Sequence, residues 1–246
     1  MTYKLRTSLI IILLIVMSVV VYLVQFWIYR RPEDMGFYFL EDLAFVPISV
    51  LLVTLGLNTV LNRRDRQAML EKVSIVVNEF YAEAGTDLII GLRDYMVNLD
   101  ELSGNLQMKS SWKDSDFFKA RTFVSEHPIV IDISRKNILE LRGLFESKKD
   151  QILRLFENAN LMEHDAFTDM LWALYHVYDE LRSRDSLDQL PDADCNHLNL
   201  DIQRAARLLL LEWLDSMRAL RVRYPYLYSL AVRKCPFGEC KVVIDS

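Results

Sequence analysis

The chain is poor in helix-breaking residues and in cysteine: among 246 residues there are seven glycines, six prolines and three cysteines. Glycine and proline form most tight turns, so their scarcity argues against an architecture of many short strands. The odd and sparse set of cysteines argues against a secreted disulfide framework. Long segments without breakers favour helices, and we therefore predict an all-α protein.

Recognisable catalytic motifs are absent as well. The sequence has no P-loop, no dinucleotide-binding glycine fingerprint, no GxSxG elbow, no kinase motif set and no HExxH. Its four histidines are scattered, and none accompanies a nucleophile in a known motif. Residues 67–195 carry more acidic than basic side chains, whereas nucleic-acid binding needs a basic surface. We predict no catalytic residue, no cofactor and no nucleic-acid partner, and leave open whether the protein is an enzyme.

Long uncharged segments are what the sequence has instead. Residues 8–28 and 43–61 contain no charged side chain, and each is long enough, at about 1.5 Å per residue, to cross a hydrocarbon core roughly 30 Å thick. A signal peptide would have an apolar region of only about 7–15 residues followed by small residues, whereas the first segment ends in bulky side chains. A polar loop, 30–42, separates the two. The sequence predicts a transmembrane helical hairpin within 1–66.

Basic residues around these segments indicate an orientation. The two outer flanks together carry six Lys and Arg residues against two in the loop, so the positive-inside rule places both termini in the cytoplasm. The expected location is the inner (plasma) membrane, as a multi-pass protein with reduced thiols. The lipid bilayer is then the first partner. Aromatic and basic residues are expected at its interfaces: Trp27, Tyr29, Arg63, Arg64 and Arg66.

The remaining chain, 67–246, has the periodicity of a cytoplasmic antiparallel helical bundle. Helical spacing resumes at Met69, so one nearly continuous helix is expected from Leu43 to Ala84. A heptad-spaced stripe follows from Leu88 to Leu106, expected as one helix. Further helices are expected over 116–125, from a Ser134 N-cap to about 158, over 161–184 and over 197–223, with one short extended segment at 129–133. Four or five amphipathic helices with short loops form a bundle.

The C-terminal segment carries a resemblance to a known family. YPYLYSLAVR, Tyr224–Arg233, resembles the YPYL(F/Y)SLA-R motif of an uncharacterised family of prokaryotic proteins with two transmembrane helices. The resemblance extends to HDAFTDMLWA, 164–173. It implies a two-span helical membrane protein and brings no activity and no assigned site. Cys235 and Cys240 depart from the pattern, so the resemblance implies nothing for them.

One face of the 161–184 helix gathers candidate metal ligands. At about 100° per residue, four carboxylates and one imidazole fall on one side of this helix: Asp165, Asp169, His176, Asp179 and Glu180. Metal ligands in helix bundles are arranged in this way. The opposite face is apolar, and the paired Glu-x-x-His signature on two helices is absent. A charged face opposite an apolar one is usually solvated, which is the interpretation we favour.

Two further groups of residues suggest binding chemistry. The first group has three thiols and one imidazole, which suit a tetrahedral zinc site: Cys195, His197, Cys235 and Cys240. Their spacing is unusual, and we favour the interpretation that they are ordinary reduced cysteines and a histidine without a metal. The second group consists of basic and aromatic residues near the C-terminus, which suit binding of RNA or anionic lipid: Trp213, Arg218, Arg221, Arg223, Tyr224, Tyr226, Tyr228, Arg233 and Lys234. We favour the alternative in which the aromatic residues pack in the core and the basic residues pair with the acidic middle of the chain.

Three functions remain open at this point. The hairpin and a bundle without catalytic motifs favour a membrane-anchored adaptor, scaffold or sensor that acts on other membrane or cytoplasmic proteins. Two spans per chain also suit a subunit of an oligomeric channel or transport complex, so a homo-oligomer is possible. The third alternative is a metal-binding sensor or enzyme that uses the candidate ligands above.

Overall fold

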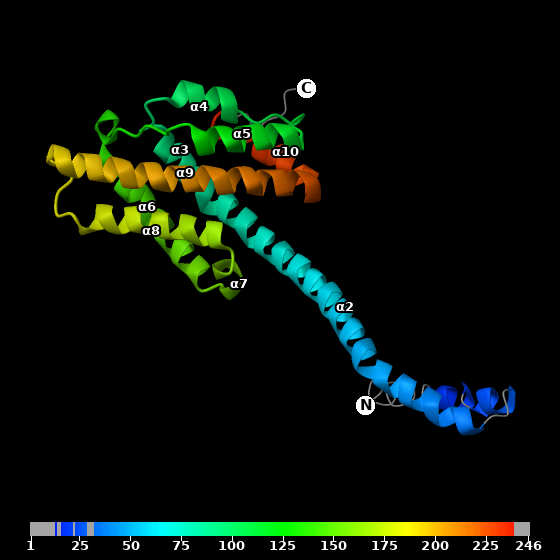
Figure 1. Ribbon diagram of the computed structural model, residues 1–246. Helices are drawn as coiled ribbons and strands as arrows, with labels where there is room; N and C mark the ends of the chain where they lie inside the picture. The colour runs from blue at the N-terminus through cyan, green and yellow to red at the C-terminus, as the bar shows by residue number, and fades with distance from the viewer. Residues whose placement is uncertain (1–12, 14–15, 22, 29–31, 239–246) are drawn as a thin grey trace. The chain divides into compact units, whose positions relative to one another are not determined.

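The computed structural model describes residues 13, 16–21, 23–28 and 32–238, with the backbone alone described for 32–35 and 56–71. The described chain is helical and contains no strand, only one isolated antiparallel bridge between Met96 and Ile131. The all-α prediction is confirmed. The elements (Figure 1) are α2 Pro32–Phe80, the π-helical turn Tyr81–Gly85, α3 Thr86–Arg93, α4 Leu99–Leu106, α5 Asp114–Glu126, the 3-10 turn Ile133–Arg135, α6 Ile138–Phe156, α7 Ala159–Met162, α8 Asp165–Ser183, α9 Asp192–Arg223 and α10 Pro225–Arg233.

Helix α2 corrects the predicted loop at 30–42. The helix begins at Pro32 and runs to Phe80, so most of that segment is helical. Proline suits the first helical turn because its fixed φ is already helical and its missing N–H has no partner there. The predicted continuity from Leu43 past the basic cluster is present in the backbone.

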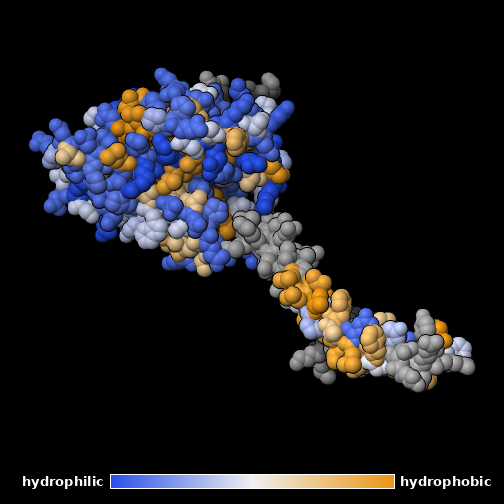
Figure 2. Space-filling model, viewed as in Figure 1, coloured by the Kyte–Doolittle hydropathy of each residue, from blue (hydrophilic) through white to orange (hydrophobic). Residues whose placement is uncertain are grey.

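One helix in the described part of the chain is long and apolar enough to cross a membrane. This stretch, Gly36–Leu55, begins earlier than the predicted span at 43–61, and none of it is buried within the protein. Figure 2 shows it as a band of apolar surface. The first predicted span, 8–28, corresponds in part to a shorter apolar helix, Val16–Ile28. The predicted hairpin of two membrane spans is therefore not established by the fold.

The helical domain is built on α6, α8 and α9, and the chain divides by its internal contacts between Arg66 and Gln67. Helices α8 and α9 form the most extensive packing pair, and α6 packs on α8. Their apolar faces are those that the sequence pattern predicts. The fully buried residues include Phe145 of α6, Phe167 and Leu174 of α8, and Ile202 and Leu209 of α9.

The heptad stripe from Leu88 to Leu106 is not one helix. Helix α3 ends at Arg93, and α4 begins at Leu99. Between them Tyr95 is buried, and its carbonyl accepts a hydrogen bond from the backbone N–H of Asp132 at 3.0 Å. The antiparallel bridge between Met96 and Ile131 pairs the same two segments. Long-range backbone pairing with the 129–133 segment therefore replaces the helical bonds that the periodicity predicts.

Two helix starts also differ from the prediction. Helix α6 is capped by Asn137, whose side chain accepts from the backbone N–H of Leu139 at 3.0 Å. Ser134 instead lies in the 3-10 turn, where it donates to Asp132. Helix α9 begins at Asp192, directly after Pro191, so the loop to α8 is shorter than predicted. The longer α9 places its first turns beside the end of α8.

Candidate functional site

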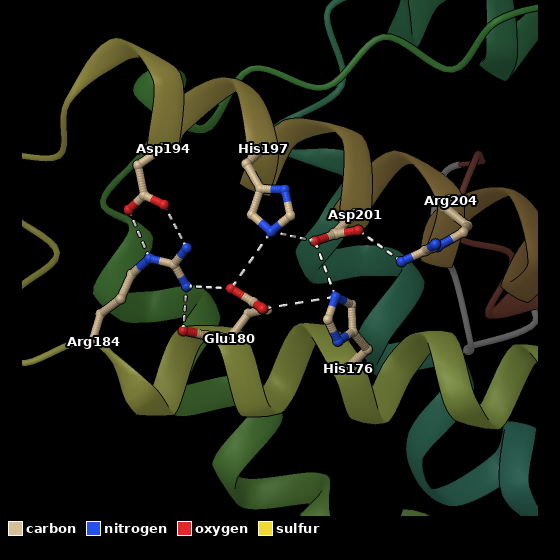
Figure 3. A network of polar contacts seen from close by, with 7 residues as sticks. All are labelled: His176, Glu180, Arg184, Asp194, His197, Asp201 and Arg204. Carbon is tan, nitrogen blue, oxygen red and sulfur yellow. Dashed lines mark hydrogen bonds and ion pairs between the residues drawn. The ribbon is translucent and has the colours of Figure 1, made fainter.

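Helices α8 and α9 run antiparallel and place two similar pairs of side chains opposite each other. On α8, His176 and Glu180 are one helical turn apart and share a face; on α9, His197 and Asp201 do the same. The short 184–191 connection fixes the register, in which residue 176 lies opposite 201 and residue 180 opposite 197. Figure 3 shows the four side chains converging between the two helices. We call them the α8–α9 cluster.

The ligand atoms of the α8–α9 cluster lie close together. One carboxylate oxygen of Asp201, Oδ2, is 3.1 Å from Nε2 of His176 and 3.2 Å from Nε2 of His197. The two oxygens of Glu180 are each 3.8 Å from one imidazole, Oε1 from His176 and Oε2 from His197. All four groups offer ligand atoms within 4.8 Å of one another.

Each carboxylate of the cluster is held by an arginine. Arg184 donates to Oε2 of Glu180 at 2.7 Å, and Arg204 donates to Oδ1 of Asp201 at 2.7 Å. Arg184 is itself held by Asp194 through two hydrogen bonds, of 2.8 Å and 2.6 Å. This bidentate pairing fixes the guanidinium at the first turn of α9 (Figure 3). The orientation of both carboxylates is therefore set by neighbours outside the cluster.

Burial and charge differ among the cluster residues. The Asp201 side chain is 9% exposed, whereas those of His176 and His197 are 43% and 53% exposed. The hydrogen bond from Arg184 lowers the pKa of Glu180, with the charges of Arg184 and both histidines acting in the same direction and burial opposing them. The same guanidinium lowers the pKa of Asp194. Glu180 and Asp194 are therefore ionised at neutral pH.

The cluster has the chemistry of a cation site that is open on one side. Two imidazoles and two carboxylates are common ligands of first-row transition metals, and exposed histidines leave access from solvent. The same groups can also hold α8 to α9 through hydrogen bonds and ion pairs alone. Asp201 is one of three buried polar or charged residues within the described ranges, beside Glu212 and Ser216. A buried carboxylate requires partners, which the cluster supplies.

The other candidate ligands of α8 do not join the cluster. Asp165, Asp169 and Asp179 are exposed, which agrees with the solvated face predicted for them. His176 and Glu180 depart from that prediction because α9 lies against their side of the helix. The sequence signal for the cluster is a His-x3-carboxylate pair that occurs on both consecutive helices, and it cannot be recognised from the pattern of one helix alone.

The candidate zinc ligands are not brought together. The Cys195 thiol contacts the carbonyl of Leu190 at 3.7 Å, and the Cys235 thiol contacts the carbonyl of Leu106 at 3.7 Å. Cys235 is close in sequence to Phe237, which packs on Trp213. Trp213 lies about 27 Å along α9 from Cys195, at about 1.5 Å per residue. Cys240 lies outside the described residues, and His197 belongs to the α8–α9 cluster instead.

The predicted membrane-interface residues are described only in part. Trp27 is exposed, and Tyr29 lies outside the described residues. Arg63, Arg64 and Arg66 lie on α2, for which only the backbone is described there. Their role at a membrane interface therefore stays a prediction.

Several of the basic and aromatic residues near the C-terminus are engaged within the helical domain, whereas Tyr226 and Lys234 are exposed. Arg218 and Arg221 both donate to Asp114, at 3.4 Å and 2.7 Å. Trp213 and Tyr228 are buried, and the Tyr228 hydroxyl donates to the carbonyl of Lys109 at 3.0 Å. These contacts are the packing and pairing that the sequence interpretation favoured.

Comparison with known proteins gives a family. A model described as the N-terminal helical domain of MJ1433 matches residues 4–61, and one described as the C-terminal helical domain of the uncharacterized protein MJ1433 matches 69–233. Over 235 residues the chain is 37% identical to the uncharacterized protein MJ1433 of Methanocaldococcus jannaschii, an alignment that covers 95% of this chain and 94% of that protein. No solved structure matches the chain. In the YPYLYSLAVR segment Tyr224 is the N-cap and the remaining residues form α10, inside the second matched range.

Proposed function

This chain belongs to the family of helical proteins that includes MJ1433, and we propose that it is a membrane-anchored adaptor or sensor. Its apolar N-terminal part holds the chain in the bilayer, and its helical domain acts on partner proteins at the cytoplasmic face. The proposal places the protein in the inner (plasma) membrane with both termini in the cytoplasm, as the distribution of Lys and Arg favours.

One observation carries the proposal: helix α2 belongs to both parts of the chain. Over Gly36–Leu55 the helix is apolar, without burial inside the protein. Its last turns have the opposite environment, because Val73, Val77 and Phe80 lie in the core of the helical domain. A lone exposed apolar side chain is ordinary in a soluble protein, but a whole apolar helix is not. A bilayer is the environment that suits such a helix.

Aspartate substitution within α2 tests the anchor. Ile48→Asp with Leu52→Asp adds two charges on one face of the apolar stretch, at roughly 2.5–3.5 kcal/mol each near the centre of a membrane helix. We expect the unmodified chain to resist alkaline carbonate extraction and the double variant to lose most of its membrane-bound pool. The matched control, Leu200→Asp with Val222→Asp, changes two exposed apolar residues of α9. Release of the unmodified chain by carbonate, or an unchanged double variant, contradicts the anchor.

Cross-linking tests the adaptor role separately. Short amine-reactive cross-linkers applied to native membranes are expected to capture the chain with one or more other proteins in fixed ratio. The Leu200→Asp and Val222→Asp variant provides the comparison for the helical domain surface, and the α2 variant shows which partners depend on membrane attachment. If only monomers or copies of the same chain are recovered, the adaptor role is wrong while the anchor stands.

A further inference from the structure

We propose that the α8–α9 cluster is a binding site for one divalent first-row transition-metal ion, with His176, Glu180, His197 and Asp201 as ligands. The ion class is that of Zn²⁺, Co²⁺, Ni²⁺ and Fe²⁺, not Mg²⁺ or Ca²⁺. This site goes beyond the proposed function and does not depend on it, because the four residues belong to the helical domain alone.

The spacing of the ligand atoms is the first argument. Four ligands arranged tetrahedrally about 2.1 Å from one ion lie about 3.4 Å from each other. The separations within the cluster are 3.1 and 3.2 Å from Oδ2 of Asp201 to the imidazoles, and 3.8 Å from a different oxygen of Glu180 to each of them. With one ligand atom taken from each residue, all four lie within 4.8 Å of one another. The side chains would therefore have to move closer together, Glu180 most of all, to surround one ion.

The position of Glu180 is the second argument. At 3.8 Å its oxygens are beyond hydrogen-bonding distance of either imidazole. Its carboxylate, held by Arg184 at 2.7 Å, nevertheless lies between His176 and His197 (Figure 3). The pairing with Arg184 does not require this carboxylate to lie near both imidazoles as well, whereas coordination of a shared ion does.

The donor set selects the kind of ion. Imidazole nitrogen suits zinc, copper, iron and nickel, whereas magnesium and calcium take all-oxygen surroundings. The carboxylates of Glu180, Asp201 and Asp194 outnumber the guanidinium groups of Arg184 and Arg204 that pair with them, so a negative charge is left that favours a cation. That balance matters most at Asp201, the most buried of the four. The ion would replace the imidazole N–H groups as the main partner of this carboxylate.

The residues around the cluster resemble the outer shell of a metal site. Ligating carboxylates are themselves hydrogen-bonded in such sites, which orients them toward the ion. Here Arg184 holds Glu180 and Arg204 holds Asp201, and Asp194 fixes Arg184. The two histidines are about half exposed, so an ion can enter from solvent.

The experiment is metal titration of the full-length protein in detergent, purified without a histidine tag and stripped with a chelator. Isothermal titration with Zn²⁺ is expected to give one saturable site per chain, undisturbed by excess Mg²⁺ or Ca²⁺. Substitution of Co²⁺ is expected to give the intensified visible absorption of a site with fewer than six ligands. Absence of the saturable site, or a Co²⁺ spectrum equal to that of the aqueous ion, overturns the proposal.

Variants locate the ion within the protein. Glu180→Gln keeps the side-chain shape, and His197→Gln removes one imidazole; each is expected to lower Zn²⁺ affinity by more than about tenfold, at least the loss caused by removing an outer-shell partner. The matched controls are Asp179→Asn, an exposed neighbour on α8, and His127→Gln, an exposed histidine outside the cluster. Helical circular dichroism checks that the variants fold. If both cluster variants bind as the unmodified chain does, the ion is elsewhere and the proposal is wrong.

Discussion

Gly85 is the residue whose replacement tests the packing at the end of α2 most sharply. It closes the π-helical turn Tyr81–Gly85 with helical dihedral angles, φ −61° and ψ −40°. A Cβ atom added there would lie 2.5 Å from Cδ1 of Tyr81 and 2.8 Å from Cε1 of Phe80. Carbon atoms normally approach to about 3.5–4.0 Å. Both rings would therefore have to move to accommodate alanine.

Neither ring is free to move. Tyr81 is 1% exposed, and its hydroxyl donates to the carbonyl of Leu209 at 2.8 Å. Phe80 is buried edge-on against Phe167, with ring centroids 5.9 Å apart. Overpacking a core costs about 1–3 kcal/mol, and we take the upper end because two rings are obstructed. The gain in helix propensity from glycine to alanine, about 1 kcal/mol, offsets part of it. The net loss is about 2 kcal/mol.

Thermal unfolding of full-length protein in detergent measures this loss. For a domain of this size, about 2 kcal/mol corresponds to a fall in Tm of roughly 4–8 °C for Gly85→Ala. Gly104→Ala is the matched control, because Gly104 lies within α4 and a Cβ there has no neighbour within 4 Å. It is expected to raise stability by about 0.5–1 kcal/mol. If Gly85→Ala is as stable as the unmodified chain while Gly104→Ala behaves as expected, the packing argument is wrong.

Three further predictions concern single contacts and the proposed ion. Tyr81→Phe removes the buried hydrogen bond to Leu209 and is expected to cost about 1–2 kcal/mol in urea unfolding; no loss would contradict that contact. Folding lowers the pKa values of Glu180 and Asp194, so these carboxylates stabilise the fold above about pH 4, and this stabilisation is lost as pH falls through the lowered values. Arg184→Gln should therefore weaken the dependence of the free energy of unfolding on pH in the acid range. An unchanged dependence would refute this. Zn²⁺ at 100 times its Kd should stabilise folding by about 2.7 kcal/mol, and an unchanged Tm would contradict binding to the folded state alone.

The fold was predictable where helical periodicity meets a single buried face. The inward residues expected on the last long helix, Ile202, Leu209, Trp213, Met217 and Leu220, are all buried. The pattern failed where long-range pairing competes with it. Leu88 to Leu106 has heptad spacing, yet Met96 pairs with Ile131, far away in the sequence. Local spacing carries no information about such a partner.

The α8–α9 cluster was predictable only in part, for a related reason. His176 and Glu180 were recognised as one face of a helix, and His197 was assigned to a different candidate site with the cysteines. Bringing them together requires the register of two helices, which depends on where α9 begins. The start at Asp192 adds residues that local patterns assigned to a loop, and the shorter connection to α8 sets the register in which His197 lies opposite Glu180.

Protease protection of intact spheroplasts tests the central claim, that α2 anchors the chain and leaves the helical domain in the cytoplasm. If the proposed topology is correct, the helical domain, 67–238, is protected in intact spheroplasts and digested only after the membrane is opened. An antibody to the domain would detect it in intact and in opened spheroplasts, and a known cytoplasmic protein would serve as the control in both. Digestion of the domain from outside, or its recovery in the soluble fraction without any treatment, would contradict the account.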